Sequence, residues 1–92
     1  MEAVFFPPGG AVHMRFISHN VDVLITTAQQ LKSRYFVTQD GERDGVPIWG
    51  VFDVSKATWF LNAYVLPDPI KTFTAENSNA AVMFALARIG RG

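Results

Sequence analysis

Three strand-like segments follow one another between residues 35 and 66, with no helical pattern between them. They are YFVTQ at 35–39, VPIWGVFDV at 46–54 and ATWFLNAYVL at 57–66. The polar loop DGERDG separates the first two, and a tight connection near Ser55 and Lys56 separates the last two. Runs of adjacent strands favour an antiparallel sheet with helices segregated to one face. This stretch therefore predicts an α+β fold.

The remaining segments complete the predicted order ββαβββ(β)α. EAVFF at 2–6 and AVHMRFI at 11–17 read as a hairpin, because the second segment alternates apolar and polar residues. IKTF at 70–73 is a possible further short strand, written (β) in this order. We predict one compact domain over 1–92, with a sheet of about five strands and two helices, at about 21–33 and 75–89, on one face.

The helix predicted at 21–33 has an alternative. Asn20 is a suitable N-cap, and Asp22 in the first turn suits the helix dipole. The β-branched cluster between Val21 and Thr27 favours a strand instead, since such side chains lose rotamer freedom in a helix. We expect the helix, because the apolar positions from Val21 to Leu31 fall on one face.

Composition excludes several classes of protein. With 92 residues, 49% hydrophobic and 17% charged, the chain suits one ordered domain. A formal net charge of zero is unfavourable for binding phosphates, and the absence of cysteine removes disulfides, thiolate catalysis and Cys-type zinc sites. No segment approaches the roughly 20 apolar residues of a membrane span, and the first residues lack a signal-peptide pattern. We expect a soluble, cytoplasmic protein that does not bind membranes.

The polar residues do not form a convincing catalytic or metal site. Asp40, Glu42, Asp44 and Gly45 match a calcium loop, but its last ligand, a bidentate Glu, would fall on Val51. A plain hairpin loop is therefore expected. His13 and His19 are the two histidines and have no cysteine partner. We predict no catalytic residues, no metal, no cofactor and no enzymatic activity.

The C-terminal segment NAAVMFALARIG predicts a helix that is apolar almost all round. Eight residues, Ala80 to Ala87, carry no charge. At 100° per residue, one face holds Val82, Ala85, Leu86 and Ile89 and suits the sheet. Phe84 points nearly opposite, between Ala80 and Ala87. Either a partner chain covers Phe84, or it is exposed alone or covered by the N-terminal hairpin.

We therefore predict a protein–protein interaction domain. It would be a homodimer, or a subunit or inhibitor that binds a larger host or phage protein complex. Small phage-encoded proteins that block a host complex fit this profile, and such a protein would act in the host cytoplasm. Aromatic and Arg side chains are the usual anchors of interfaces. The predicted interface residues are Met83, Phe84, Ala87, Arg88, Trp49 and Tyr64.

Two other functions stay as alternatives. A nucleic-acid-associated module would use a local basic and aromatic surface. Its contact residues would be Arg15, Lys32, Arg34 and Lys71. A small ligand-binding domain or enzyme would instead use a pocket on the sheet, lined by Trp49, Trp59 and a carboxylate.

Overall fold

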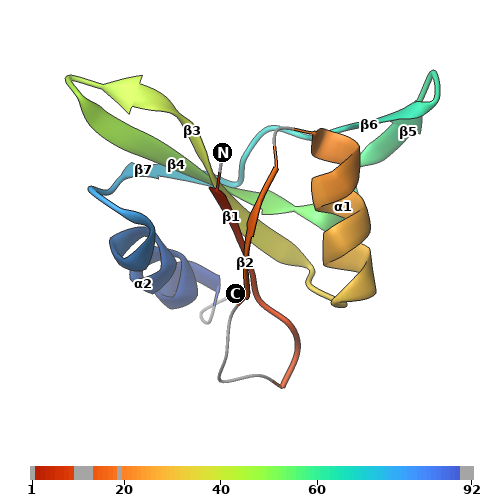
Figure 1. The fold of residues 1–92 in the computed structure, drawn as a ribbon, viewed down its shortest axis with the longest axis horizontal. Helices are drawn as coiled ribbons and strands as arrows, with labels where there is room; N and C mark the ends of the chain where they lie inside the picture. The colour runs from red at the N-terminus through yellow and green to blue at the C-terminus, as the bar shows by residue number, and fades with distance from the viewer. Residues whose placement is uncertain (1, 10–13, 19, 90–92) are drawn as a thin grey trace.

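A computed structural model of the chain describes residues 2–9, 14–18 and 20–89 (Figure 1). Five strands form one antiparallel sheet in the order β2-β1-β3-β4-β7, and β5 pairs with β6 in a separate hairpin. The predicted α+β class and five-stranded antiparallel sheet are confirmed. The elements are β1 (Glu2–Phe5), β2 (Met14–Ile17), α1 (Val21–Gln30), β3 (Tyr35–Arg43), β4 (Val46–Asp53), the 3-10 turn η1 (Val54–Lys56), β5 (Thr58–Phe60), β6 (Ala63–Val65), β7 (Lys71–Thr74) and α2 (Ser78–Ile89).

The β3–β4 hairpin is the longest pairing in the sheet. It runs in register from Tyr35 opposite Asp53, passes an irregularity between Gln39 and Glu42, and continues to Arg43. The loop predicted at 40–45 is shorter in the structure, because β3 continues into it as far as Arg43. Asp44 and Gly45 alone form the turn, with φ values of 53° and 81°. Asp-Gly is favoured there because both turn positions need positive φ.

The two helices pack on opposite faces of this sheet. Phe36 and its cross-strand partner Phe52 belong to a buried cluster with Leu24 and Ala28 of α1. The next cross-strand pair points to the other face. That second cluster joins Val37, Trp49 and Val51 to Ala81 and Ala85 of α2. In Figure 1, α2 and α1 accordingly lie on either side of β1 and β2.

This arrangement differs from the predicted placement of both helices on one face. Phe36, Val37 and Val51 are all fully buried, so the central strands are apolar on both sides. A strand covered on both faces reads as a continuous apolar run, whereas a strand with one wet face alternates. The runs in 35–39 and 46–54 are of the first kind, and they require a layer on each side.

The predicted first helix is confirmed and ends three residues earlier than expected. The Asn20 side chain accepts a hydrogen bond from the Asp22 N–H at 2.8 Å. At the other end, the Ser33 and Lys32 N–H groups donate to the Ala28 and Gln29 carbonyls at 2.8 and 3.1 Å. This pair of hydrogen bonds is a Schellman motif. It holds Lys32 at φ 57°, a left-handed conformation that favours glycine.

The predicted single strand at 57–66 is wrong. The segment forms β5, a turn at Leu61 and Asn62, and β6, with Trp59 opposite Tyr64. Leu61 and Asn62 have φ values of 50° and 67°, which close a two-residue hairpin turn. Leu is an unusual residue for positive φ, so the sequence carries a weak turn signal here. We refer to residues 58–65 as the β5–β6 arm.

The last helix begins at Ser78 rather than at 75. The Asn77 side chain caps it by accepting a hydrogen bond from the Ala80 N–H at 2.9 Å. Val82 and Ala85 are buried as predicted, and Ala81 joins them. Leu86 is exposed instead of facing the sheet. Residues 11–13 of the second predicted strand lie outside the described residues.

Lys32→Gly should stabilise the protein. Glycine relieves the left-handed strain at the end of α1, and we expect the free energy of unfolding to rise by about 0.5–1 kcal/mol in urea denaturation. Gln29→Gly is the matched control, because Gln29 is exposed within the helix. It should lower the free energy of unfolding by about 0.5–1 kcal/mol. A loss of stability in both variants would contradict the capping role.

Candidate protein-contact surfaces

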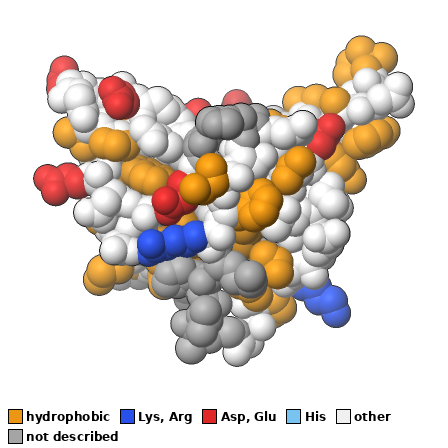
Figure 2. Space-filling model, in the orientation of Figure 1, with side chains coloured by type: hydrophobic (Ala, Val, Ile, Leu, Met, Phe, Trp, Pro, Cys, Tyr) orange, Lys and Arg blue, Asp and Glu red, His pale blue; other side chains and the backbone are white. Residues whose placement is uncertain are grey.

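The end of the β5–β6 arm exposes three consecutive large apolar side chains. Trp59, Phe60 and Leu61 are 59%, 62% and 81% exposed. The cross-strand pairs place Trp59 with Tyr64 on one face of the arm and Phe60 with Ala63 on the other. Figure 2 shows hydrophobic atoms at the end of this arm, at the upper right, away from the body of the molecule. Both faces of the arm are therefore apolar, and neither is covered.

The arm also carries no charge. The ten residues 57–66 contain no Asp, Glu, Lys or Arg. Natural proteins protect unpaired strand edges with charged side chains, proline or a covering element. A two-stranded hairpin is marginally stable by itself in water, so an uncovered and uncharged one needs support. The structure provides that support at the base of the arm.

Asp22 of α1 fixes the arm from one side. Its Oδ1 accepts a hydrogen bond from the Tyr64 backbone N–H at 2.7 Å. The Tyr64 ring in turn meets the Trp59 indole edge to face, with ring centroids 4.7 Å apart and planes at 74°. Edge-to-face aromatic pairs stabilise by about 0.5–1.5 kcal/mol beyond burial. The arm is thus attached to α1, which fixes its orientation.

Asp53 fixes the connection between β4 and the arm. Its Oδ1 accepts hydrogen bonds from the Ser55 N–H and hydroxyl at 3.0 and 2.6 Å, and Arg34 pairs with Oδ2 at 3.2 Å. Burial alone would raise the pKa of Asp53, but the Ser55 and Arg34 hydrogen bonds and the Arg34 charge outweigh it and lower the pKa. The carboxylate therefore stays ionised and holds η1 in place.

A second apolar surface lies on α2. Phe84 is 52% exposed and stacks on Phe73 of β7, with ring centroids 4.6 Å apart and planes at 20°. Met83 beside it is 74% exposed, and Ala87 and Arg88 are exposed as well. One side of Phe84 is therefore covered by the chain's own edge strand and the other faces solvent. The stack with Phe73 thus covers part of the Phe84 side of α2, for which the sequence indicated no covering element.

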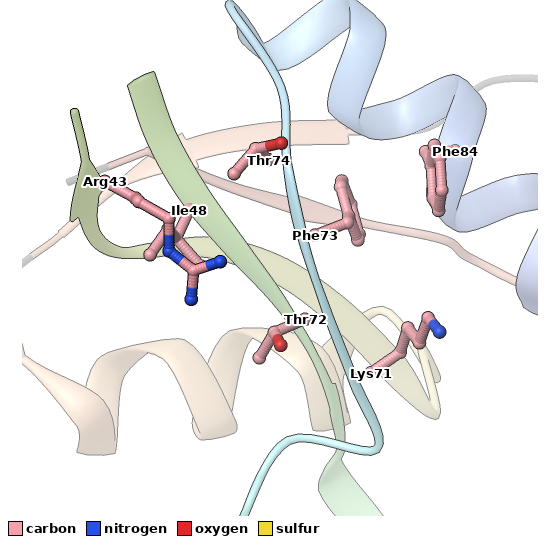
Figure 3. Close-up of a pocket in the computed structure, with 7 residues that line it drawn as sticks. All are labelled: Arg43, Ile48, Lys71, Thr72, Phe73, Thr74 and Phe84. Atoms are coloured by element: carbon pink, nitrogen blue, oxygen red, sulfur yellow. The ribbon is translucent and has the colours of Figure 1, made fainter. Parts of the chain in front are cut away.

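Two hollows adjoin this surface. A hollow of about 370 Å³ follows β7, and one of about 280 Å³ lies beside it against α2. Phe84 and Lys71 line both. Figure 3 shows Lys71, Phe73 and Phe84 on one side of β7, with Arg43 and Ile48 on the other. No acidic residue is among the described residues that line either hollow.

The structure does not bring the six predicted interface residues together. Met83, Phe84, Ala87 and Arg88 share the outer side of α2. Trp49 is buried in the core, where its Nε1 donates to the Ala75 carbonyl at 3.1 Å, so its side chain presents no surface. Tyr64 lies in the arm, which is a different place again.

The four cations of the nucleic-acid alternative are also dispersed. Arg15 on β2 bonds the Asn79 side chain and lies 4.0 Å from the Glu2 carboxylate. Arg34 pairs with Asp53 and lies 5.2 Å from the Tyr35 ring centroid. Lys32 follows the C-terminus of α1, and Lys71 lines the two hollows beside β7. His13 and His19 lie outside the described residues.

Searches for a metal site, a membrane helix and similar proteins give no further indication of function. Within 2–9, 14–18 and 20–89, no group of three or more acidic or histidine side chains could hold a metal ion. No helix among those residues is long and apolar enough to cross a membrane. The chain matches no protein-family model, no curated protein and no solved structure in comparisons with each.

The exposed tip of the arm was missed from the sequence. The segment 57–66 predicted one continuous strand, so no exposed turn with Phe60 and Leu61 beside it was expected. Asn62 is the one signal that could have revealed the turn, because Asn tolerates positive φ. The lack of charge on both sides of that turn would then have indicated an uncovered hairpin.

Stability should depend on pH through Asp53. Its pKa is lowered by folding, so its contribution is fully present above the unfolded value of about 3.9 and is lost as pH falls through the folded pKa. Between neutral and strongly acidic pH, the free energy of unfolding should fall less steeply for Asp53→Asn than for wild type, as measured by denaturation. Asp68→Asn removes one exposed carboxylate and controls for net charge. Equal pH dependence of Asp53→Asn and wild type would contradict this role.

Phe84→Ala should leave the fold intact. The ring is half exposed, so losing it and its stack should lower the free energy of unfolding by about 1–2 kcal/mol. Phe36→Ala empties a fully buried site and should cost about 3–5 kcal/mol. Urea denaturation measures both. If the two losses were equal, Phe84 would be a core residue rather than part of a contact surface.

Proposed function

We propose that this protein is a non-enzymatic protein-interaction domain that contacts its partner through the β5–β6 arm. One observation carries the proposal, namely the run Trp59-Phe60-Leu61 exposed at the end of an arm without charge. Single exposed apolar residues are normal on a protein surface. Consecutive ones on both faces of a projecting element are typical of a contact site.

The arm has the physical properties of an interface anchor. Trp is enriched at the energetic centres of interfaces, where the surrounding contacts exclude water. Burying a side chain such as Phe60 or Leu61 would contribute about 1.5–3 kcal/mol. Because Asp22 and Asp53 already hold the arm in place, less conformational freedom would be lost on binding.

The partner in this proposal is a second copy of the chain or a larger protein complex. Binding to a larger complex would include the phage-inhibitor role expected from size and composition. The protein would act in the cytoplasm, where a chain without cysteine has no disulfide to lose. The outer side of α2, with Met83, Phe84, Ala87 and Arg88, stays a proposed second contact. No catalytic residue or cofactor takes part.

Leu61→Asn should separate binding from folding. Asn suits the positive φ of this turn position, so stability should be unchanged or up to about 1 kcal/mol higher. Binding should nevertheless weaken, because the most exposed apolar side chain is gone. Sedimentation at rising concentration reports a second copy, and affinity capture from cells that produce the protein reports another partner.

Trp59→Ser should weaken the same complex. Ile17→Thr is the matched control, because it removes an exposed apolar side chain from β2 and leaves the arm intact. It should retain wild-type binding. A complex that survives both Leu61→Asn and Trp59→Ser, or a monomer that captures no partner, would overturn the proposal.

A further inference from the structure

We propose that the free edge of β7 binds an extended acidic segment of another protein, which pairs with β7 as an additional strand. β7 is the last strand of the sheet, and its outer side has no strand partner among the described residues. The site is separate from the β5–β6 arm. The site shares Phe84 and Arg88 with the second contact proposed on α2, but the inference stands or falls independently of the arm.

The backbone of β7 offers hydrogen-bonding groups at this edge. The Ala75 N–H donates to the Pro47 carbonyl at 3.1 Å, and the register continues with Phe73 opposite Trp49 and Lys71 opposite Val51. In an antiparallel pair, alternate residues bond the partner strand and the residues between them point away. Thr72 and Thr74 therefore direct their N–H and C=O groups to the free edge.

The hollow of about 370 Å³ follows this edge. All four residues of β7 line it, although Lys71 and Phe73 face α2 while Thr72 and Thr74 face the other side of the sheet. A space that touches both faces of an edge strand must pass around its outer side. Figure 3 shows these side chains alternating along β7. An added strand would occupy this position and gain main-chain hydrogen bonds.

Charge selects the occupant. Arg43, Lys71 and Arg88 line the two adjoining hollows, all three are exposed, and none has an ion pair with any residue in the described part of the chain. The described lining includes no carboxylate. A segment with Asp or Glu at alternate positions would place its carboxylates beside these cations. Such complementarity also steers association.

Apolar contacts would fix the register. On the α2 side, the exposed face of Phe84 offers a surface for one side chain of the added strand. On the other side, Ile48 borders the hollow. Pockets for alternate side chains give specificity when a peptide adds to a sheet edge. An alternation of acidic and aliphatic residues is therefore the expected chemistry of the segment.

Two other occupants fit less well. Self-pairing of two β7 edges would bring the cations Arg43, Lys71 and Arg88 of both copies to one seam, where the described lining supplies no carboxylate to pair with them. Single-stranded nucleic acid binds by stacking bases on aromatic rings. Phe73 and Phe84 already stack on each other, and the outward amides of β7 would stay unused.

The test uses a fluorescein-labelled peptide of alternating Glu and Val, about eight residues long, titrated with the full chain and followed by anisotropy. We expect saturable binding that is lost with a Lys/Val peptide and with a Glu/Val peptide N-methylated at alternate residues. Thr72→Pro should weaken binding at least about tenfold, because it removes an outward N–H without touching the β4 ladder. Lys71→Glu should weaken binding similarly.

Thr72→Val is the matched control, since it keeps the N–H and should bind within about twofold of wild type. Circular dichroism of each variant checks folding. Failure of the Glu/Val peptide to bind, or equal binding by Thr72→Pro or by the N-methylated peptide, would overturn the proposal. Tighter binding of labelled oligothymidylate, unaffected by Thr72→Pro, would overturn it in favour of a nucleic-acid surface. Arm variants such as Leu61→Asn should bind the peptide normally.

Discussion

The pairing of β3 with β4 is the interaction on which the rest of the structure depends. These strands share the longest register in the sheet, and their side chains are buried on both faces. Phe36 and Phe52 stack with ring centroids 5.4 Å apart under α1, while Val37 and Val51 meet α2. Each face of a central strand requires a covering helix, which fixes the position of both helices.

This use of both helices determines what is left outside. One helix covers each face, so no layer remains for the β5–β6 arm or for the outer edge of β7. The arm emerges where β4 ends, held by Asp53 at its base and by Asp22 at Tyr64. β7 pairs with β4 on the side away from β3, so its outer edge ends the sheet. The apolar arm and the basic edge are thus consequences of the same central hairpin.

The sequence predicts the elements better than their surroundings. Asn20 and Asp22 mark the start of α1, and Asp44 with Gly45 marks a hairpin, because these residues have local conformational preferences. The placement of α2 could not be derived in this way, since it depends on which faces of distant strands need cover. Continuous apolar runs at 35–39 and 46–54 do contain that information, because strands with one wet face alternate.

Individual residues show the same limit. Trp49 and Trp59 are both aromatic residues in strand-like runs, yet one is buried and the other is exposed. Local sequence does not separate them, because the difference arises from the turn at Leu61, whose φ is unusual for its residue type. Phe84 was identified as a residue without an evident cover, and the structure covers it in part through Phe73. The exposed apolar tip of the arm became visible only with the fold.

The two tryptophans provide the most direct measurement of the central claim, that the arm is open in the free protein and covered in its complex. Acrylamide quenching of Trp49→Phe reports Trp59, and quenching of Trp59→Phe reports Trp49 in the core. We predict strong quenching of Trp59 in the free protein, protection of Trp59 in the complex, and protection of Trp49 in both. Protection of Trp59 in the free monomer, or unchanged quenching in the complex, would contradict the account.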